Sequence, residues 1–313
     1  YMKIIDLHCD VLGKLTKADP PIKFSSAIQL QASKEKLQAG QVVIQDFAIF
    51  IGEDVPQADK FTEAMRQVEL FYTNVLQPNP DVIHITDWKQ VYTLKEGQLG
   101  AILSLEGCDA IGEDLLKLQT LLDAGVKLVG LTWNFENSVA YGAEENPNQG
   151  LKPFGKEVIE LLNDRDIIID VSHLNEKSFW DVLPLAKHLI ASHSNARALC
   201  NHTRNLSDEQ AIALVKQGGH IHVVYYPPFI KEGTDDVTID DLVKHVKYLA
   251  ELVGIEHIGL GSDFDGIDRT VIGLENASQS QNLILTLFQH FSEDEVKMIA
   301  NENFLRYIQK QGI

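Results

Sequence analysis

The stretch Ile4-Ile5-Asp6-Leu7-His8-Cys9-Asp10 combines a short apolar run with two polar side chains at its end. His8 and Asp10 are two residues apart, so on a β-strand both side chains would face the same way. Imidazole and carboxylate groups are suitable ligands for Zn²⁺ and similar ions. Taken alone, the pair fits a metal site and a polar surface pair at a strand end equally well.

Seven further apolar runs along the chain are short and rich in Val, Ile and Leu, as buried parallel strands are. They cover residues 42–51, 101–106, 127–133, 167–173, 189–193, 220–226 and 257–263. Segments with helical spacing of apolar residues separate most of them, at residues 58–76, 112–124, 154–162, 176–183, 207–216 and 239–252. The tail from residue 279 onward is also predicted to be helical.

Strands that alternate with helices predict a parallel sheet, and eight such strands are the number that closes a TIM-like (β/α)₈ barrel. The alternative is an open doubly wound sheet, which predicts a glycine-rich turn after the first strand. Residues 8–13 read His-Cys-Asp-Val-Leu-Gly and lack that turn. We therefore predict a single barrel domain over residues 1–313, with additional C-terminal helices and room for a short extra strand near residues 82–85.

The composition argues against several classes of partner. The 313 residues carry a net charge of -18, which disfavours binding to nucleic acid and to anionic membrane surfaces. No apolar run reaches the length of a membrane span, and the first residues enter a strand pattern without the apolar core of a signal peptide. Three cysteines are too few for a disulfide scaffold, so we expect a cytoplasmic protein.

Polar residues interrupt the apolar runs at their carboxyl ends, which in a closed barrel form the rim where active sites lie. Besides the first pair, these residues are Glu106, His173, His193 and Asp263. Each has an ordinary interpretation alone, such as a helix-start carboxylate for Glu106 or a hydrogen-bonded structural residue for a histidine. Because they gather at one end of the predicted strands, a metal site is favoured.

Two further residues have chemistry that suits such a rim. A carboxylate beside a metal-activated water can act as general base, and Asp263 has that position. Arg204 follows a strand by one short loop, and a guanidinium there predicts a clamp for a substrate carboxylate, with a surface salt bridge as the alternative. Asp265 is better explained as a turn residue before Gly266.

The chain resembles the membrane (renal) dipeptidase family of metallopeptidases, within the amidohydrolase-type barrels. The resemblance rests on Asp6-Leu7-His8-Cys9-Asp10, Leu105-Glu106-Gly107, residues 125–137, Asp170-Val171-Ser172-His173, Ala191-Ser192-His193-Ser194, Arg204-Asn205-Leu206 and residues 259–266, in order along nearly the whole chain.

The resemblance implies two Zn²⁺ ions, with other divalent metals as alternatives. One ion would be held by His8 and Asp10, the other by His173 and His193, and Glu106 would bridge them, with a bridging hydroxide as nucleophile. Asp263 would then shuttle the proton, and Arg204 would bind the C-terminal carboxylate of a dipeptide.

The sequence departs from the family at two places. Well-known animal members end the fourth strand in Leu-Thr-His, whereas this chain has Leu131-Thr132-Trp133-Asn134. Trp133 and Asn134 therefore become the candidates for substrate contacts there. The first motif has Cys9 where many members have Asn, and strand alternation predicts that Cys9 points away from the metals.

Three hypotheses follow from these residues. The first is a metallo-dipeptidase that cleaves small free dipeptides, including those of the L-Xaa-D-Xaa type. The second keeps the site but changes the substrate, as in a lactonase, amidase or deaminase. The third is a metal-binding protein without turnover. By analogy with relatives, a homodimer is the expected assembly if the chain self-associates.

Overall fold

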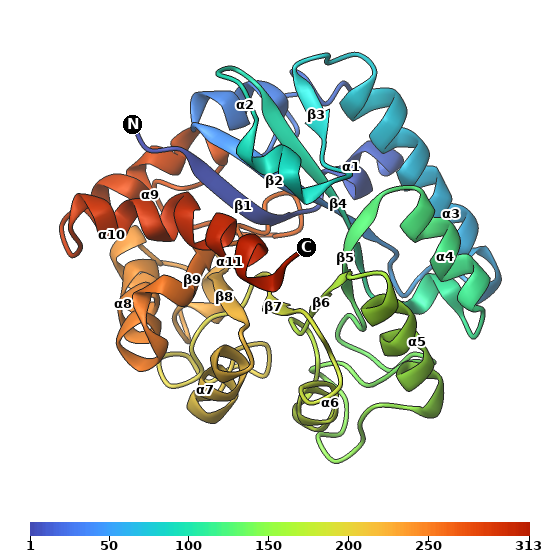
Figure 1. Cartoon of the computed structure of the whole chain (residues 1–313). Coiled ribbons are helices and arrows are strands. Elements are labelled where there is room, and N and C mark those ends of the chain that lie inside the picture. The colour runs from blue at the N-terminus through green and yellow to red at the C-terminus, as the bar shows by residue number, and fades with distance from the viewer.

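The computed structural model describes residues 1–313, and eight of its strands form a closed parallel barrel (Figure 1). Around the ring the order is β2-β1-β9-β8-β7-β6-β5-β4, and the pairing of β2 with β4 closes it. The barrel strands are β1 (Ile4–Cys9), β2 (Val42–Phe50), β4 (Leu99–Glu106), β5 (Val126–Gly130), β6 (Ile168–Asp170), β7 (Leu189–Ala191), β8 (His220–Val223) and β9 (Ile258–Leu260). The predicted TIM-like α/β barrel is confirmed.

One short strand, β3 (Val82–His84), lies outside the ring. It pairs in parallel with the start of β4, where Ile83 is opposite Gly100. The other edge of β4 is occupied by β2 at the same position, and β5 pairs with β4 only from Leu103 onward. The extra strand predicted near residues 82–85 is therefore present, as an addition to the eight-stranded barrel.

Helices surround the barrel, and the longer ones follow the amphipathic segments of the sequence (Figure 1). They are α1 (Val11–Lys17), α2 (Lys34–Ala39), α3 (Gln57–Leu70), α4 (Leu115–Asp123), α5 (Pro153–Asp164), α6 (Glu176–Val182), α7 (Asp208–Lys216), α8 (Ile239–Val253), α9 (Ser280–Leu287), α10 (Glu293–Lys297) and α11 (Asn303–Gln311). The predicted C-terminal helices are thus present as α9 to α11. None of the helices has the combination of length and apolar character that a bilayer span requires.

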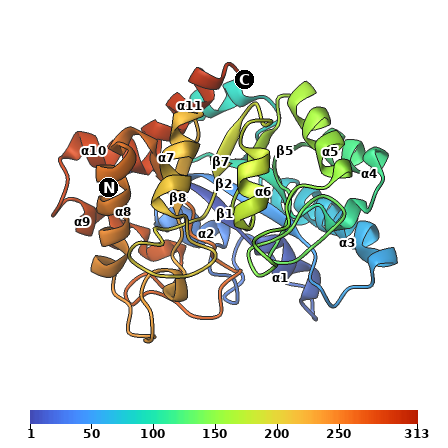
Figure 2. The ribbon, with the colours of Figure 1, turned by 90° about the horizontal axis from the view of Figure 1, so that it is seen from below.

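The apolar core is divided by the barrel wall. A large cluster fills the layer between strands and helices, and Cys9 packs there, facing away from the rim as strand alternation predicts. A smaller cluster combines strand residues such as Ile44 and Ile102 with Phe304 and Tyr307 of α11. Helix α11 therefore closes the amino end of the barrel, opposite the end where the long loops gather (Figure 2).

Candidate functional site

The predicted site residues converge at the carboxyl end of the barrel. The Oε2 atom of Glu106 lies 3.3 Å from His8 Nε2, 3.0 Å from His173 Nε2 and 3.3 Å from His193 Nε2. These four residues come from β1, β4 and the segments after β6 and β7, up to 185 positions apart in the chain (193 − 8). One carboxylate oxygen therefore lies at the centre of three imidazole nitrogens.

A second group of ligand atoms shares His8 with the first. Its Nε2 atom is 3.2 Å from Asp10 Oδ2 and 3.6 Å from Asp263 Oδ1. The sets His8–Glu106–His193 and His8–Asp10–Asp263 are each close enough to hold one metal ion. The rim thus offers two adjacent groups of candidate ligands.

Backbone irregularity aims these side chains. The pairing of β1 with β2 shifts register between Asp6 and Cys9, the segment that contains His8, and such irregularities commonly redirect a side chain near an active site. His173 and Asp263 both have left-handed backbone, with φ of 77° and 66°. Strain of this kind at non-glycine residues clusters at functional sites.

Gly266 allows the loop after β9 to approach the site closely. A Cβ atom at this position would lie 2.1 Å from Asp10 Oδ2 and 2.6 Å from Asp263 Oδ1. Any side chain would collide with both carboxylates, so glycine is required for the close approach.

Hydrogen bonds behind two histidines fix which nitrogen faces the centre. His173 Nδ1 lies 2.8 Å from the amide oxygen of Asn134, and His193 Nδ1 lies 2.7 Å from Ser192 Oγ. Because Ser192 donates its hydroxyl hydrogen to Asp170, it accepts from His193. Both Nδ1 atoms therefore carry the proton, and the Nε2 lone pairs point inward, 3.1 Å apart. This is the arrangement that histidine ligands of a metal adopt, so the donor set fits divalent ions.

The electrostatics of the rim agree with that fit. Burial lowers the pKa of His173 to about 4 and that of His193 well below its usual value, so both rings are neutral near pH 7. Burial opposes ionisation of Glu106, but the positive charge of His8 outweighs it and holds the pKa of the carboxyl well below the usual range. For His8, the Glu106 and Asp10 carboxylates outweigh burial and raise the pKa well above the ordinary value. The carboxylates therefore favour positive charge at this point.

Three buried aspartate–serine pairs, which the sequence analysis missed, connect neighbouring strands near the site. In each pair the serine hydroxyl donates to the aspartate carboxylate, as seen for Ser262 with Asp6, Ser192 with Asp170, and Ser104 with Asp46. Each includes a residue within two positions of His8, His193 or Glu106. The available sequence signal was an Asp or Ser just before each candidate ligand.

Arg204 is buried close to the histidines, with 3% of its surface exposed. One guanidinium nitrogen donates to the backbone oxygen of His193 at 2.9 Å, and the group lies 5.1 Å from the centre of the Phe229 ring. Its Nε and Nη1 atoms have no hydrogen-bond partner. Buried unpaired donors are costly, and a bound carboxylate would satisfy them. The surface salt-bridge alternative for Arg204 is excluded by its burial.

Asp265 has a structural place. Its carboxylate accepts hydrogen bonds from Lys14 Nζ at 2.8 Å and from the backbone nitrogens of Gln31 and Ala32 at 2.7 and 2.9 Å. It therefore ties the loop after β9 to α1 and to the following segment.

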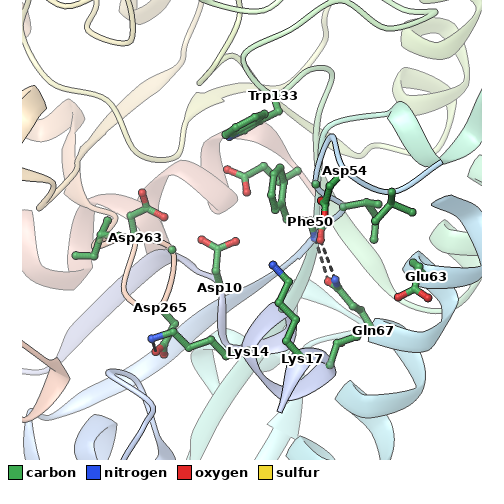
Figure 3. A pocket seen from close by; sticks show the side chains of 18 of the residues that line it. Asp10, Lys14, Lys17, Phe50, Asp54, Glu63, Gln67, Trp133, Asp263 and Asp265 are labelled. Atoms are coloured by element: carbon green, nitrogen blue, oxygen red, sulfur yellow. Dashed lines mark hydrogen bonds and ion pairs between the residues drawn. The ribbon is translucent and has the colours of Figure 1, made fainter. Parts of the chain in front are cut away.

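A cavity of about 520 Å³ opens beside the candidate ligands, and its wall includes Asp10, Glu106, His173, Asp263 and Trp133 (Figure 3). The half-buried Trp133 ring lies across the cavity from Asp10 in this view. Asn134 instead contacts His173, as described above. The substrate-contact roles of Trp133 and Asn134 stay predictions.

Comparison with known proteins gives a consistent result. The model of the family described as membrane dipeptidase (peptidase family M19) matches residues 1–312. Two uncharacterized dipeptidases of Schizosaccharomyces pombe are similar: one is 29% identical over 99% of this chain and 80% of its own length, and the other 30% identical over 81% and 62%.

Solved structures share the fold. A metallo peptidase from Rhodobacter sphaeroides, liganded with a phosphinate mimic of the dipeptide L-Ala-D-Ala, has a TM-score of 0.93 at 22% identity over 99% of both chains. The probable dipeptidase PvdM from Pseudomonas aeruginosa has a TM-score of 0.83 at 24% identity, over 92% of this chain and 91% of that one.

Proposed function

The chain belongs to the membrane dipeptidase family, peptidase family M19, and from this membership and the geometry of the rim we propose that it hydrolyses free dipeptides at a centre of two divalent metal ions. Family membership makes it a metallo-dipeptidase and favours this hypothesis over a lactonase, amidase or deaminase. The observation that carries the proposal is the Glu106 oxygen within 3.0 to 3.3 Å of three inward-facing imidazole nitrogens.

We assign the metal ligands as the residue chemistry suggests. His8 and Asp10 would hold one ion, His173 and His193 the other, and Glu106 would contribute to both; Zn²⁺ suits this mixture of imidazole and carboxylate. Divalent ions held there would polarise the scissile carbonyl and lower the pKa of the attacking water.

Asp263 is the proposed proton carrier. Burial and the neighbouring Asp10 carboxylate raise its pKa well above the usual range for an aspartic acid. A carboxyl group with a raised pKa can take a proton from water during attack and return it to the leaving amine. Its left-handed backbone holds the carboxylate 3.6 Å from His8 Nε2, at the edge of the ligand cluster.

Arg204 is the proposed anchor for the C-terminal carboxylate of the dipeptide. The Nε and Nη1 atoms have no hydrogen-bond partner in the fold, so the guanidinium has free N–H donors for a carboxylate. The same group would exclude substrates that lack a free carboxylate. We include dipeptides with a D-residue at the C-terminal position in the proposed range, since the Rhodobacter sphaeroides relative was crystallised with a mimic of L-Ala-D-Ala.

The cellular compartment, the domain organisation and the oligomeric state are proposed from the cysteines, the fold and the relatives. Cys9, Cys108 and Cys200 are free and buried, which is compatible with a reducing compartment, so we propose a cytoplasmic enzyme built as one barrel domain. Native mass spectrometry would show whether it is a monomer or the homodimer expected by analogy.

The decisive experiment combines metal analysis with a substrate panel. Chelated protein should be inactive and should recover with Zn²⁺, and elemental analysis should find two ions per chain. The metal-replete protein should then cleave members of a panel of L,L and L,D dipeptides but not N-acylated, C-amidated or lactone analogues. A metal-replete protein that leaves every dipeptide intact would overturn the proposal.

A further inference from the structure

The cavity beside the metal ligands has an apolar side that the reaction chemistry does not use. The Phe50 and Trp133 rings lie 5.1 Å apart and tilted by 58°, so that they form a corner (Figure 3). Ile51 and Val55 also line this cavity. The Trp133 ring centre is 6.3 Å from that of His173, which places the corner next to the candidate metal centre. We call Phe50, Ile51, Val55 and Trp133 the aromatic corner.

The corner is held rigidly. Phe50 is the last residue of β2, and its backbone is fixed by the Gln67 side chain of α3, which donates to the Phe50 oxygen at 2.8 Å and accepts from its nitrogen at 3.0 Å. Trp133 also contacts Phe135, with ring centres 5.4 Å apart. A preformed apolar wall needs little ordering when a ligand packs against it.

Barrel topology fixes which part of a dipeptide reaches this corner. In the ring of eight strands, β7 is four positions from β2 in either direction, so the two strands are diametrically opposite. Arg204 follows β7 and Phe50 ends β2, and the candidate ligands come from the carboxyl ends of β1, β4, β6 and β7 on the same rim. A dipeptide that places its C-terminal carboxylate on Arg204 and its peptide bond at the metal centre therefore extends its N-terminal residue toward Phe50.

We propose that the aromatic corner is the subsite for the N-terminal side chain and makes the enzyme selective for dipeptides whose first residue is bulky and apolar, such as Leu, Met or Phe. The inference rests on the proposed dipeptidase function and on Arg204 as the carboxylate anchor. Packing a large apolar side chain against such a wall removes it from water, and this gain is absent for glycine. The rest of the cavity wall is mostly polar, so this gain is confined to side chains that reach the Phe50 and Trp133 rings.

The test compares matched substrates and variants in the zinc-loaded enzyme. For the wild type, kcat/KM for Leu-Ala and Phe-Ala should exceed that for Gly-Ala by at least about tenfold. In Phe50→Ala, kcat/KM for the two bulky substrates should fall by about 10- to 100-fold, while Gly-Ala changes by less than about threefold. In Trp133→Ala, the loss for the two bulky substrates should exceed the loss for Gly-Ala by about tenfold or more. Ala-Phe, which carries the bulk on the second residue, should behave like Gly-Ala.

A matched control separates this role from general destabilisation. Trp180 on α6 is 41% exposed and lies outside the cavity wall, so Trp180→Ala should leave all four substrates unchanged. Trp133→Phe should retain most of the selectivity, and it serves in place of Trp133→Ala if that variant does not fold.

Two outcomes would contradict the inference in different ways. Equal losses for Gly-Ala and Phe-Ala in Trp133→Ala and Phe50→Ala, with hydrolysis intact in the wild type, would remove the subsite and leave the dipeptidase function standing. Absence of hydrolysis of every dipeptide by the zinc-loaded wild type would instead overturn the proposed function and this inference with it.

Discussion

The two ends of the barrel use buried histidines in opposite ways. At the carboxyl end, His173 and His193 have one nitrogen hydrogen-bonded by the protein and the other directed at Glu106. At the amino end, His220 packs against Tyr307 and His222 against Phe304. There, His220 Nδ1 and His222 Nε2 have no hydrogen-bond partner.

This difference shows what distinguishes a ligand from a core histidine when both are buried. At the carboxyl end, the neutral imidazoles of His173 and His193 face an ionised carboxylate, an arrangement that suits a bound cation. At the amino end, the rings lie among aromatic side chains without a charged partner, and burial lowers the pKa of His220 to about 2 and of His222 to about 4. The carboxyl end therefore carries the chemistry, while the amino end contributes to stability.

The strongest test of this division replaces the central carboxylate. Glu106→Gln removes one of the charges that favours cations at the rim, and kcat/KM should fall by at least about 10⁴-fold. The free energy of unfolding of the chelated protein should change little. Without metal the rim holds several neighbouring carboxylates, and removing one of these charges relieves their mutual repulsion. Activity on a dipeptide panel and calorimetric melting with chelator would measure the two effects. Activity retained within tenfold of the wild type would contradict the assignment of Glu106.

The converse test is at the amino end. Phe304→Ala leaves a cavity between α11 and the strands, and the free energy of unfolding should fall by about 3–5 kcal/mol. Activity per folded molecule should stay within about twofold, since no candidate ligand contacts Phe304. Urea unfolding of the chelated protein and active-site titration of the zinc-loaded protein would measure both. Loss of activity in the folded fraction would show that the two ends are coupled.

Most of the barrel was predictable because buried parallel strands are continuous apolar runs. The eight runs correspond to the eight barrel strands, although the segments predicted at residues 127–133 and 167–173 become β5, ending at Gly130, and β6, ending at Asp170. These strands end early because the backbone must depart from regular β geometry for the rim side chains to point toward the site. The left-handed backbone of His173 is an example. Periodicity does not report such departures.

The candidate ligands were also predictable, since strand-end position restricts where polar residues can meet. The supporting contacts were not. Nothing in the sequence spacing of Asp46 and Ser104 indicates that their side chains form a hydrogen bond between the adjacent strands β2 and β4. Such partners depend on the register of strand pairing, which the spacing does not report. Likewise, nothing in the position of Asn134 beside Trp133 indicates that its amide oxygen contacts His173.

A smaller effect is expected from the contacts that orient the ligands. Asp170→Asn weakens the bond to Ser192 and so the orientation of His193, and zinc affinity should fall by about 10- to 100-fold. Competition with a chromophoric chelator would measure it. Asp46→Asn is the matched control, because Ser104, its partner, contacts no histidine nitrogen. Equal losses of affinity in the two variants would show that buried charge, and not orientation of His193, sets zinc binding.

The smallest expected effect concerns acid stability at the amino end. His222 has a pKa of about 4 in the fold because it is buried, whereas in the unfolded chain an imidazole titrates near the ordinary value of 6.5. As the pH falls from about 6.5 to about 4, protons bind the unfolded chain preferentially, so stability decreases over this window. His222→Leu should reduce the loss of unfolding free energy between pH 7 and pH 5 by about 1–2 kcal/mol, measured on chelated protein so that the rim contributes no metal release. The exposed His290, changed to Gln, is the surface-histidine control. His222 Nδ1 bonds to the Leu260 oxygen, and only Nε2 lacks a partner. If His222→Leu kept the full acid sensitivity, burial of this ring would not set the pH dependence, and the electrostatic contrast between the two ends would be wrong.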